Sequence, residues 1–418
     1  MIPVRARLAV FALLLLALVA APAAAVKRRA FVTSVQGNGN LSSWSDSGGL
    51  SGVAAGDNIC RVRAAAAGLP NAATYRAWLS TPLADAYCHV RGQTGQKSTG
   101  CVGTAVAAGP WYRYDGVGRF SGTLDELTGP EERIYQPIRF DENGETPPEA
   151  SPSYWTGTGF EGQALAKTCA GWVVGQEGLT GSHGAADTTT ERWTWSNTDG
   201  CHGLRRLLCL EPGASEVTPV PWVPAALVFT TSTFGNGDLG SWPEAGGQSG
   251  LAAGDAICRN LAAAARLPSP QSFFAWLSSS AVDATDRMTL EDRPFRRVDG
   301  FRVADSKADL LSGSNDNTLH VDEWGRYLTI EPRVWTGTSA TGTVNLAWNC
   351  LDWLDGTNEE HGLHGWSSEA YNDSWTDADT ATGCPGSNRL YCFSNREVLF
   401  WDGFDLSENT ERWSSTQP

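Results

Sequence analysis

Oxygen-bearing side chains crowd one region near the C-terminal end of this 418-residue sequence, where Tyr371-Asn-Asp373 follows several acidic residues. Calcium takes six to eight hard oxygen ligands, so a loop rich in carboxylates and amides has suitable chemistry. Asn372 and Asp373 are therefore the candidate calcium ligands. The further donors nearby are Asp352, Asp355, Asn358, Glu359, Glu360, Asp377 and Asp379. A solvated acidic loop explains the same composition, and we favour it, so no cofactor is expected.

Two histidines in the same region, His361 and His364, form a His-x-x-His motif flanked by glycines. A divalent metal could use this pair, but two ligands do not complete a site. We favour a loop histidine that makes a structural hydrogen bond. His183 occupies the position equivalent to His364 in an earlier part of the chain.

Tryptophan is abundant, with 18 residues, and several recur at matched places: Trp44 and Trp242, Trp78 and Trp276, Trp155 and Trp335, Trp172 and Trp353, Trp193 and Trp375. Recurrence favours a role in the core, where large aromatic side chains dominate burial. Unmatched aromatics, including Trp111, are better candidates for contact with a ligand. We predict Trp348, Trp366 and Tyr371 as ligand-binding residues.

The sequence lacks the common catalytic motifs. It contains no Gly-x-Ser-x-Gly, His-Glu-x-x-His, Walker loop or Gly-x-Gly-x-x-Gly after a strand. Carboxylate pairs for glycoside hydrolysis exist in any acidic protein, and nothing singles out two of them. We predict that the protein is not an enzyme and has no catalytic residues.

The elements that must position these residues occur twice. Phe31-Val-Thr-Ser34, Gly37-Asn-Gly-Asn40 and Cys60 recur 198 residues later as Phe229-Thr-Thr-Ser232, Gly235-Asn-Gly-Asp238 and Cys258. A repeat this long indicates a duplicated domain. We predict domains over residues 27–212 and 226–395, a Pro-rich linker over 213–225, and a tail over 396–418 that contains Asp402-Gly-Phe404.

Each copy is predicted to be an α+β domain. An opening strand precedes an Ala-rich helix, over residues 54–67 and 252–265, and short strands with long loops follow it. One or two early helices followed by short strands and long loops are typical of an α+β domain.

The N-terminal segment predicts export. Residues 1–25 carry two arginines, a short apolar run and a small-residue cleavage site, the order of a secretory signal peptide. No second apolar run follows, so no membrane span is expected. The net charge of −15 argues against nucleic acid as a partner. Oligomeric state is not indicated.

All ten cysteines follow the cleavage site, so disulfides are expected rather than zinc. Each copy has four at equivalent places: Cys60, Cys169, Cys201 and Cys209, against Cys258, Cys350, Cys384 and Cys392. Four cysteines allow three pairings, and the residues alone do not choose among them. Cys88 and Cys101 lie in an insertion of the first copy, where a local bridge is the simplest interpretation.

The motifs together resemble the bacterial endostatin-like domains of the C-type lectin-like fold. The elements that carry the resemblance are Gly254-Asp-Ala-Ile-Cys258, Ala275-Trp-Leu-Ser278, Val298-Asp-Gly300, Trp335-Thr-Gly337 and Arg389-Leu-Tyr-Cys392. The resemblance implies nested disulfides: Cys60–Cys209 around Cys169–Cys201, and Cys258–Cys392 around Cys350–Cys384. The lectin calcium motif is incomplete, because Tyr371 stands where that motif has Trp.

The resemblance implies an exported or cell-surface adhesion protein that binds extracellular matrix or glycans without catalysis. Two tandem domains would favour bivalent binding. The alternatives are a structural envelope protein without a soluble ligand and a polysaccharide hydrolase. Heparin binding of the mammalian kind would need an arginine patch, and only Arg205-Arg206 and Arg296-Arg297 approach one.

Overall fold

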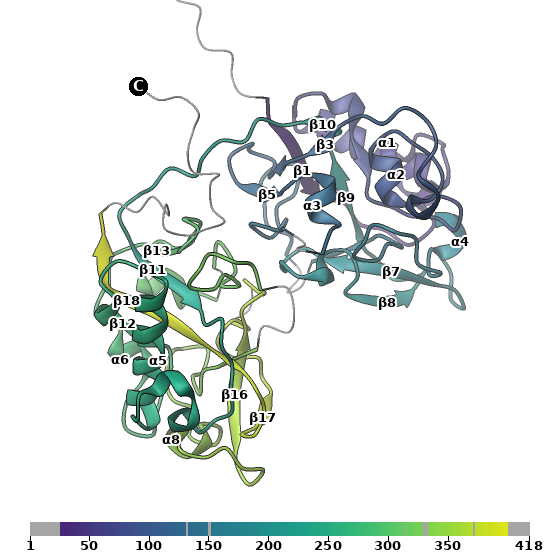
Figure 1. The fold of residues 1–418 in the computed structure, drawn as a ribbon. Coiled ribbons are helices and arrows are strands. Elements are labelled where there is room, and N and C mark those ends of the chain that lie inside the picture. The colour runs from purple at the N-terminus through teal and green to yellow at the C-terminus, as the bar shows by residue number, and fades with distance from the viewer. Residues whose placement is uncertain are drawn as a thin grey trace, which may run out of the picture.

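The computed structural model describes residues 26–130, 133–148, 152–313, 315–328, 333–370 and 373–399. These residues form two tandem domains of similar architecture, each built on an eight-stranded sheet and one long helix (Figure 1). The predicted signal peptide and the Asp402-Gly-Phe404 segment lie outside the described residues. Among the residues described, no helix combines the length and apolar character needed to cross a bilayer.

The first sheet has the strand order β5-β4-β1-β9-β6-β7-β8, and β2 pairs with β9 beside this path. The central pair, β1 and β9, is antiparallel, whereas β4 and β6 join them in parallel. The strands are β1 Arg28–Val32, β2 Arg76–Ala77, β4 Trp111–Tyr112, β5 Arg119–Ser121, β6 Ser153–Trp155, β7 Thr180–Ala185, β8 Asn197–Gly200 and β9 Arg206–Leu210.

The second sheet repeats this order and these directions as β14-β13-β11-β18-β15-β16-β17, with β12 beside β18. Its strands are β11 Ala225–Thr230, β12 Phe273–Ala275, β13 Phe295–Arg297, β14 Arg302–Ala304, β15 Arg333–Trp335, β16 His361–Trp366, β17 Ala381–Gly383 and β18 Arg389–Val398. A separate two-stranded sheet joins β3 (Ala108–Gly109) to β10 (Gly213–Ala214). The matching topology shows that the sequence repeat is a repeat of structure.

One 15-residue helix covers each sheet, α1 (Gly52–Ala66) and α5 (Gly250–Ala264). The shorter α-helices are α2 Ala86–Val90, α3 Leu124–Leu127, α6 Ala284–Arg287 and α7 Lys307–Leu310. Two further four-residue segments, α4 Cys169–Trp172 and α8 Cys350–Trp353, have left-handed backbone in place of ordinary helix. Single 3-10 turns are η1 Leu41–Ser43, η2 Ser45–Ser47, η3 Ala72–Thr74, η4 Lys97–Thr99, η5 Glu191–Trp193, η6 Leu239–Ser241, η7 Pro243–Ala245 and η8 Pro270–Ser272.

Five disulfides lie within the domains, three in the first and two in the second: Cys60–Cys209, Cys88–Cys101, Cys169–Cys201, Cys258–Cys392 and Cys350–Cys384. These are the pairs that the resemblance implied, together with the local bridge expected in the insertion. Bridges of this number are typical of an oxidising compartment. In each domain one bridge joins the long helix to the central strand, which fixes the helix on the sheet.

The recurrent tryptophans lie in the core, as expected, and none of the ten is more than 7% exposed. Trp111 was expected to be a contact residue, and this prediction is wrong. It lies in β4, is fully buried, and donates from Nε1 to the carbonyl oxygen of Glu211 at 2.9 Å. The strand register places Phe295 of β13 at the equivalent position, so a core aromatic occurs in both domains.

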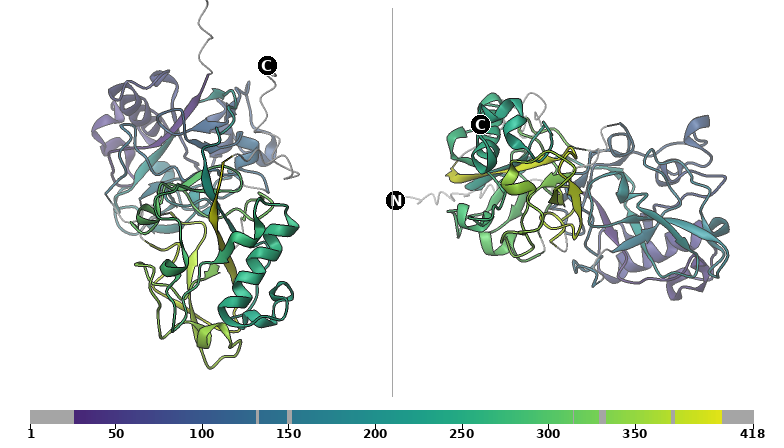
Figure 2. Two further views of the ribbon diagram at one scale, coloured as in Figure 1. Left: turned by 90° about the vertical axis from the view of Figure 1, so that its left-hand side faces the viewer. Right: turned by 90° about the horizontal axis from the view of Figure 1, so that it is seen from below.

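The two domains dock directly on one another (Figure 2). Arg297 of β13 is fully buried and donates from Nη2 to the Tyr135 carbonyl at 2.8 Å. His320 contacts the Ile134 carbonyl through Nε2 at 3.1 Å. The Tyr135 ring lies 5.4 Å from that of Tyr327. Polar and aromatic contacts thus join the domains in addition to the connecting segment.

Candidate functional site

The longest runs of positive-φ backbone among the described residues form the same feature in both domains. All four residues of α4 have positive φ, with 48° at Cys169, 57° at Ala170, 77° at Gly171 and 69° at Trp172. The four residues of α8, from Cys350 to Trp353, have φ of 49°, 51°, 57° and 67°. Left-handed backbone costs about 1–2 kcal/mol for each residue other than glycine. We call these segments the left-handed turns.

Buried contacts hold each left-handed turn in this conformation. Trp172 donates from Nε1 to the Ser80 carbonyl at 2.8 Å, and Trp353 does the same to Ser278 at 2.8 Å. Both indoles are buried. The disulfides Cys169–Cys201 and Cys350–Cys384 tie the first residue of each turn to the end of the sheet. Strain kept in two copies by surrounding structure is typical of functional sites.

The repeated Gly-Asn-Gly motif lies directly beneath each turn. A Cβ atom at Gly39 would meet Cys169 Sγ at 2.4 Å, and one at Gly237 would meet Cys350 Sγ at 2.4 Å. Only glycine therefore leaves room for the disulfide at these positions. The motif was visible in the sequence, but its role depends on a contact across more than 100 residues.

In the second domain the turn carries Asp352, one of the possible calcium donors. Its carboxylate accepts hydrogen bonds from Ser280 N at 2.6 Å, Ser280 Oγ at 2.5 Å and Asn349 Nδ2 at 2.7 Å. These bonds fix the turn against the neighbouring loop and occupy the oxygens that a metal would need. Asp352 is therefore a structural residue in this conformation.

Each left-handed turn presents aliphatic side chains at the surface. In the second domain Leu351 and Leu354 are each 56% exposed, and Leu346 shortly before them is 71% exposed. In the first domain Ala170 and Val173 are exposed at the positions of Leu351 and Leu354. Exposed apolar clusters mark sites of interaction more often than isolated apolar residues do. The turns lie at opposite ends of the molecule, away from the domain contact (Figure 1).

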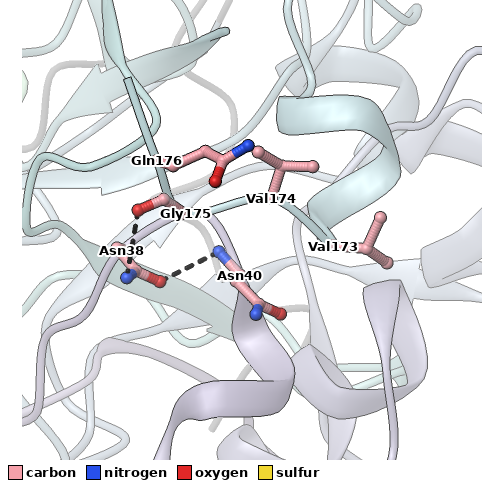
Figure 3. Close-up of a pocket in the computed structure, with 6 residues that line it drawn as sticks. All are labelled: Asn38, Asn40, Val173, Val174, Gly175 and Gln176. Atoms are coloured by element: carbon pink, nitrogen blue, oxygen red, sulfur yellow. Dashed lines mark hydrogen bonds between the residues drawn. The ribbon is translucent and has the colours of Figure 1, made fainter. Parts of the chain in front are cut away.

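A pocket of about 320 Å³ adjoins the turn of the first domain. Its lining residues are Asn38, Asn40, Val173, Val174, Gly175 and Gln176 (Figure 3). Asn38 bridges the two walls, because its Nδ2 donates to the Gly175 carbonyl at 3.4 Å and its Oδ1 accepts from Asn40 N at 3.0 Å. Amide groups beside aliphatic side chains suit a small polar ligand.

The proposed calcium ligands are only partly described. Tyr371 and Asn372 lie outside the described residues, and Asp373 is half-buried. Burial, with Asp377 and Asp379 nearby, raises the pKa of Asp373. Within the described ranges, the carboxylates of this loop do not form a three-ligand cluster.

A different acidic group comes together instead, formed by Asp305, Asp309 and Asp316. Arg302 pairs with two of the three carboxylates, since its guanidinium lies 2.8 Å from an Asp305 oxygen and 2.6 Å from an Asp316 oxygen. A cation from solution would have to displace this arginine. The group is therefore an ion-pair network.

The histidine pair does not converge on one point. His361 and His364 lie three apart in β16, so their side chains leave opposite faces of the strand. His361 is exposed, whereas His364 is buried and contacts Thr382 Oγ1 through Nδ1 at 3.1 Å. Burial, together with Arg333, lowers the pKa of His364 to about 4.

The predicted aromatic contact residues occupy two separate places. Trp348 is half-buried and lies two residues before the first residue of the left-handed turn of the second domain. Trp366 is half-buried in β16, with its ring 5.4 Å from that of His364 and beneath the guanidinium of Arg333. Of these two residues, Trp348 is the one that lies in the same segment of the chain as the exposed leucines. Those leucines were not predicted, because the turn that exposes them has no local sequence signal.

The chain matches no protein-family model and no curated protein.

Proposed function

We propose that this chain is an exported, non-catalytic binding protein with two C-type lectin-like, endostatin-like domains that engage extracellular protein or glycan ligands. The observation that carries the proposal is the left-handed turn. In both domains buried residues hold strained backbone that brings aliphatic side chains to the surface. A protein has little reason to keep such a feature twice unless the surface is used.

Two further observations support this proposal. The five disulfides suit an extracellular environment. The direct docking of the domains fixes the separation of the two turns, so a ligand with repeated epitopes would gain avidity without paying for the ordering of a linker.

The pocket beside the first turn favours a second candidate, recognition of a small polar group such as one sugar residue. Asn38 and Asn40 supply donors and acceptors there, and Val173 supplies an apolar wall. Under this alternative the first domain binds glycan and the second domain binds protein. The two candidates differ in which domain a substitution would disable.

The test is binding of the purified mature protein to immobilised glycans and matrix proteins, in calcium and again in EDTA. We expect binding that survives EDTA and is lost in the variants L351S/L354S or V173S. Loss of signal in EDTA would instead indicate a calcium site around Asp373. Absence of binding in both buffers would favour a structural protein. Turnover of a glycan would indicate a hydrolase.

A further inference from the structure

We infer that the tip of the second domain binds cationic amphipathic segments of a protein partner. The tip comprises residues 346–360, which include the left-handed turn α8. The inference deepens the proposed function and rests on it, because it names the partner chemistry of one of the two turns. Its basis is the combination of exposed leucines with carboxylates that no cation neutralises.

The tip has three exposed leucines: Leu351 on the turn and Leu354 at its end, each 56% exposed, and Leu346 in the segment before it, 71% exposed. Leu354 follows the turn directly, and its backbone N donates to the Cys350 carbonyl at 3.0 Å. The two leucines are thus held on a single tight turn that the Trp353 anchor and the disulfide keep rigid. A rigid apolar surface loses little conformational entropy on binding.

The charged part of the tip follows immediately. Asp355, Glu359 and Glu360 are exposed or half-buried, and none of them forms an ion pair with any residue that the structure describes. The Asp355 carboxylate accepts only from Thr357, at 2.7 Å from N and 3.0 Å from Oγ1, and these bonds leave its charge in place. A partner that brings cations would gain ion pairs without displacing existing ones.

The first domain provides an internal comparison, because its loop has the same length from the cysteine to the matched histidine. There Ala170 and Val173 replace the two turn leucines, and Val174, Gly178 and Leu179 replace the three carboxylates. The same backbone therefore carries an acidic, leucine-rich surface in one domain only. This difference assigns the cationic partner to the second domain.

Other occupants fit this surface less well. A second copy of the chain would bring the same carboxylates face to face in a two-fold contact, and like charges oppose such pairing. An anionic bilayer would be repelled by the tip and by the net charge of −15. A helix or strand with leucine-type residues between lysines or arginines complements both parts of the surface.

The experiment uses the mature full-length protein and a fluorescent synthetic peptide of leucine and lysine patterned as an amphipathic helix. Anisotropy measures its affinity at low and at physiological ionic strength, against a leucine–glutamate peptide of the same pattern. We expect binding of the lysine peptide only, weaker at higher salt. Equal binding of both peptides would overturn the inference.

Matched variants locate the site. We expect L351S/L354S to weaken binding of the lysine peptide by roughly tenfold or more. The control L83S/V117S replaces two exposed apolar side chains of the first domain that lie outside both turns and should leave the affinity unchanged. E359Q/E360Q should weaken binding and its salt dependence, whereas E161Q/E177Q, which alters net charge equally, should not. Equal effects of the two charge variants would show non-specific attraction and reject the site.

Two controls separate the remaining outcomes. Far-UV circular dichroism and thermal unfolding check that each variant is folded. If L351S/L354S does not fold, the affinity of E359Q/E360Q for the lysine peptide decides whether the tip is the binding site. Sedimentation velocity detects a dimer, and a dimer lost in L351S/L354S would make a second copy the occupant. If immobilised ligands bind through the tip but the lysine peptide does not, this inference fails while the proposed function stands. If the lysine peptide binds but no immobilised glycan or matrix protein does, the tip surface is established and the proposed classes of extracellular ligand are rejected.

Discussion

Arg297 Nη2 lies 2.8 Å from the carbonyl oxygen of Tyr135, which places a fully buried cation of the second domain on the backbone of the first. The same guanidinium pairs with Asp299 at 2.7 Å. Charges removed from water are tolerated only when they are paired and hydrogen-bonded. Arg297 is therefore one of several contacts that join the domains, beside the His320–Ile134 and Tyr135–Tyr327 contacts.

Replacing this arginine should be costly. Arg297→Met removes the cation and leaves Asp299 buried without its partner, so we expect a loss of about 3–5 kcal/mol in the free energy of unfolding. Guanidinium denaturation measures the change. The matched control is Arg293→Met, whose 54% exposed side chain should contribute within about 1 kcal/mol. A loss below about 1 kcal/mol at Arg297 would contradict this account of the contact.

Stability should fall with acid through the buried histidines. Burial, together with Arg333, lowers the pKa of His364 to about 4, below the value of about 6.5 that it has when unfolded. The unfolded chain therefore binds a proton first as the pH drops, so this contribution is intact above about pH 6.5 and is lost progressively towards pH 4.

The matching measurement compares the native protein with His364→Gln by denaturation between pH 7.5 and 4.5. The native protein should show the steeper loss, by up to about 1.4 kcal/mol per pH unit for one proton. Parallel curves would contradict the assignment. His320 should contribute in the same direction, because burial followed by Arg297 lowers its pKa as well.

The disulfides should differ in their effect on ligand binding. Removing Cys350–Cys384 with paired alanines should cost about 2–5 kcal/mol and release the strained turn, so binding at the second tip should disappear. The control is the Cys88–Cys101 bridge, which closes a separation of only 13 residues and does not touch either turn. Its removal should destabilise the protein while binding is kept. Equal loss of binding in both variants would show an effect of stability alone.

Calcium should not stabilise the protein. A site filled at one hundred times its dissociation constant would add about 2.7 kcal/mol to the free energy of unfolding. We expect the same melting temperature in millimolar calcium and in EDTA, because the described carboxylates around Asp373 do not converge. A higher melting temperature in calcium than in EDTA, with the difference lost in Asp373→Asn, would instead establish the site.

The domain duplication and the buried tryptophans were predictable because the same residue types recur at matched positions in both copies. The duplicated domain and the buried tryptophans follow from matched positions, and the cysteine pairs followed from the resemblance. Trp111 misled because its partner in the repeat is Phe295, a different residue type at the same strand position. Matching the two copies by sequence compares residue types, whereas the strand register compares positions in the folded sheet.

The candidate site was less predictable for a physical reason. Cys169-Ala-Gly-Trp172 and Cys350-Leu-Asp-Trp353 share only their Cys and Trp, which do not prefer left-handed backbone. Only the third position, Gly171 or Asp352, holds a residue type that adopts it readily. Their conformation is imposed by a disulfide and by an indole bonded to a carbonyl about 75 or more residues away. The place of Arg297 was also not predictable, since the sequence shows it only as one of a pair of adjacent arginines, whereas the structure places it fully buried in contact with Tyr135 of the other domain.

In the left-handed turns, the residues that fix the backbone conformation differ from those that form the exposed surface. The residues that hold the backbone, Trp172 and Trp353, face inward, whereas the positions of Ala170 and Leu351 face outward and already differ between the domains. Outward positions of this kind accept new side chains without a new fold. Each domain is therefore a natural display scaffold, in which libraries at a few tip positions would yield new binding specificities on unchanged cores.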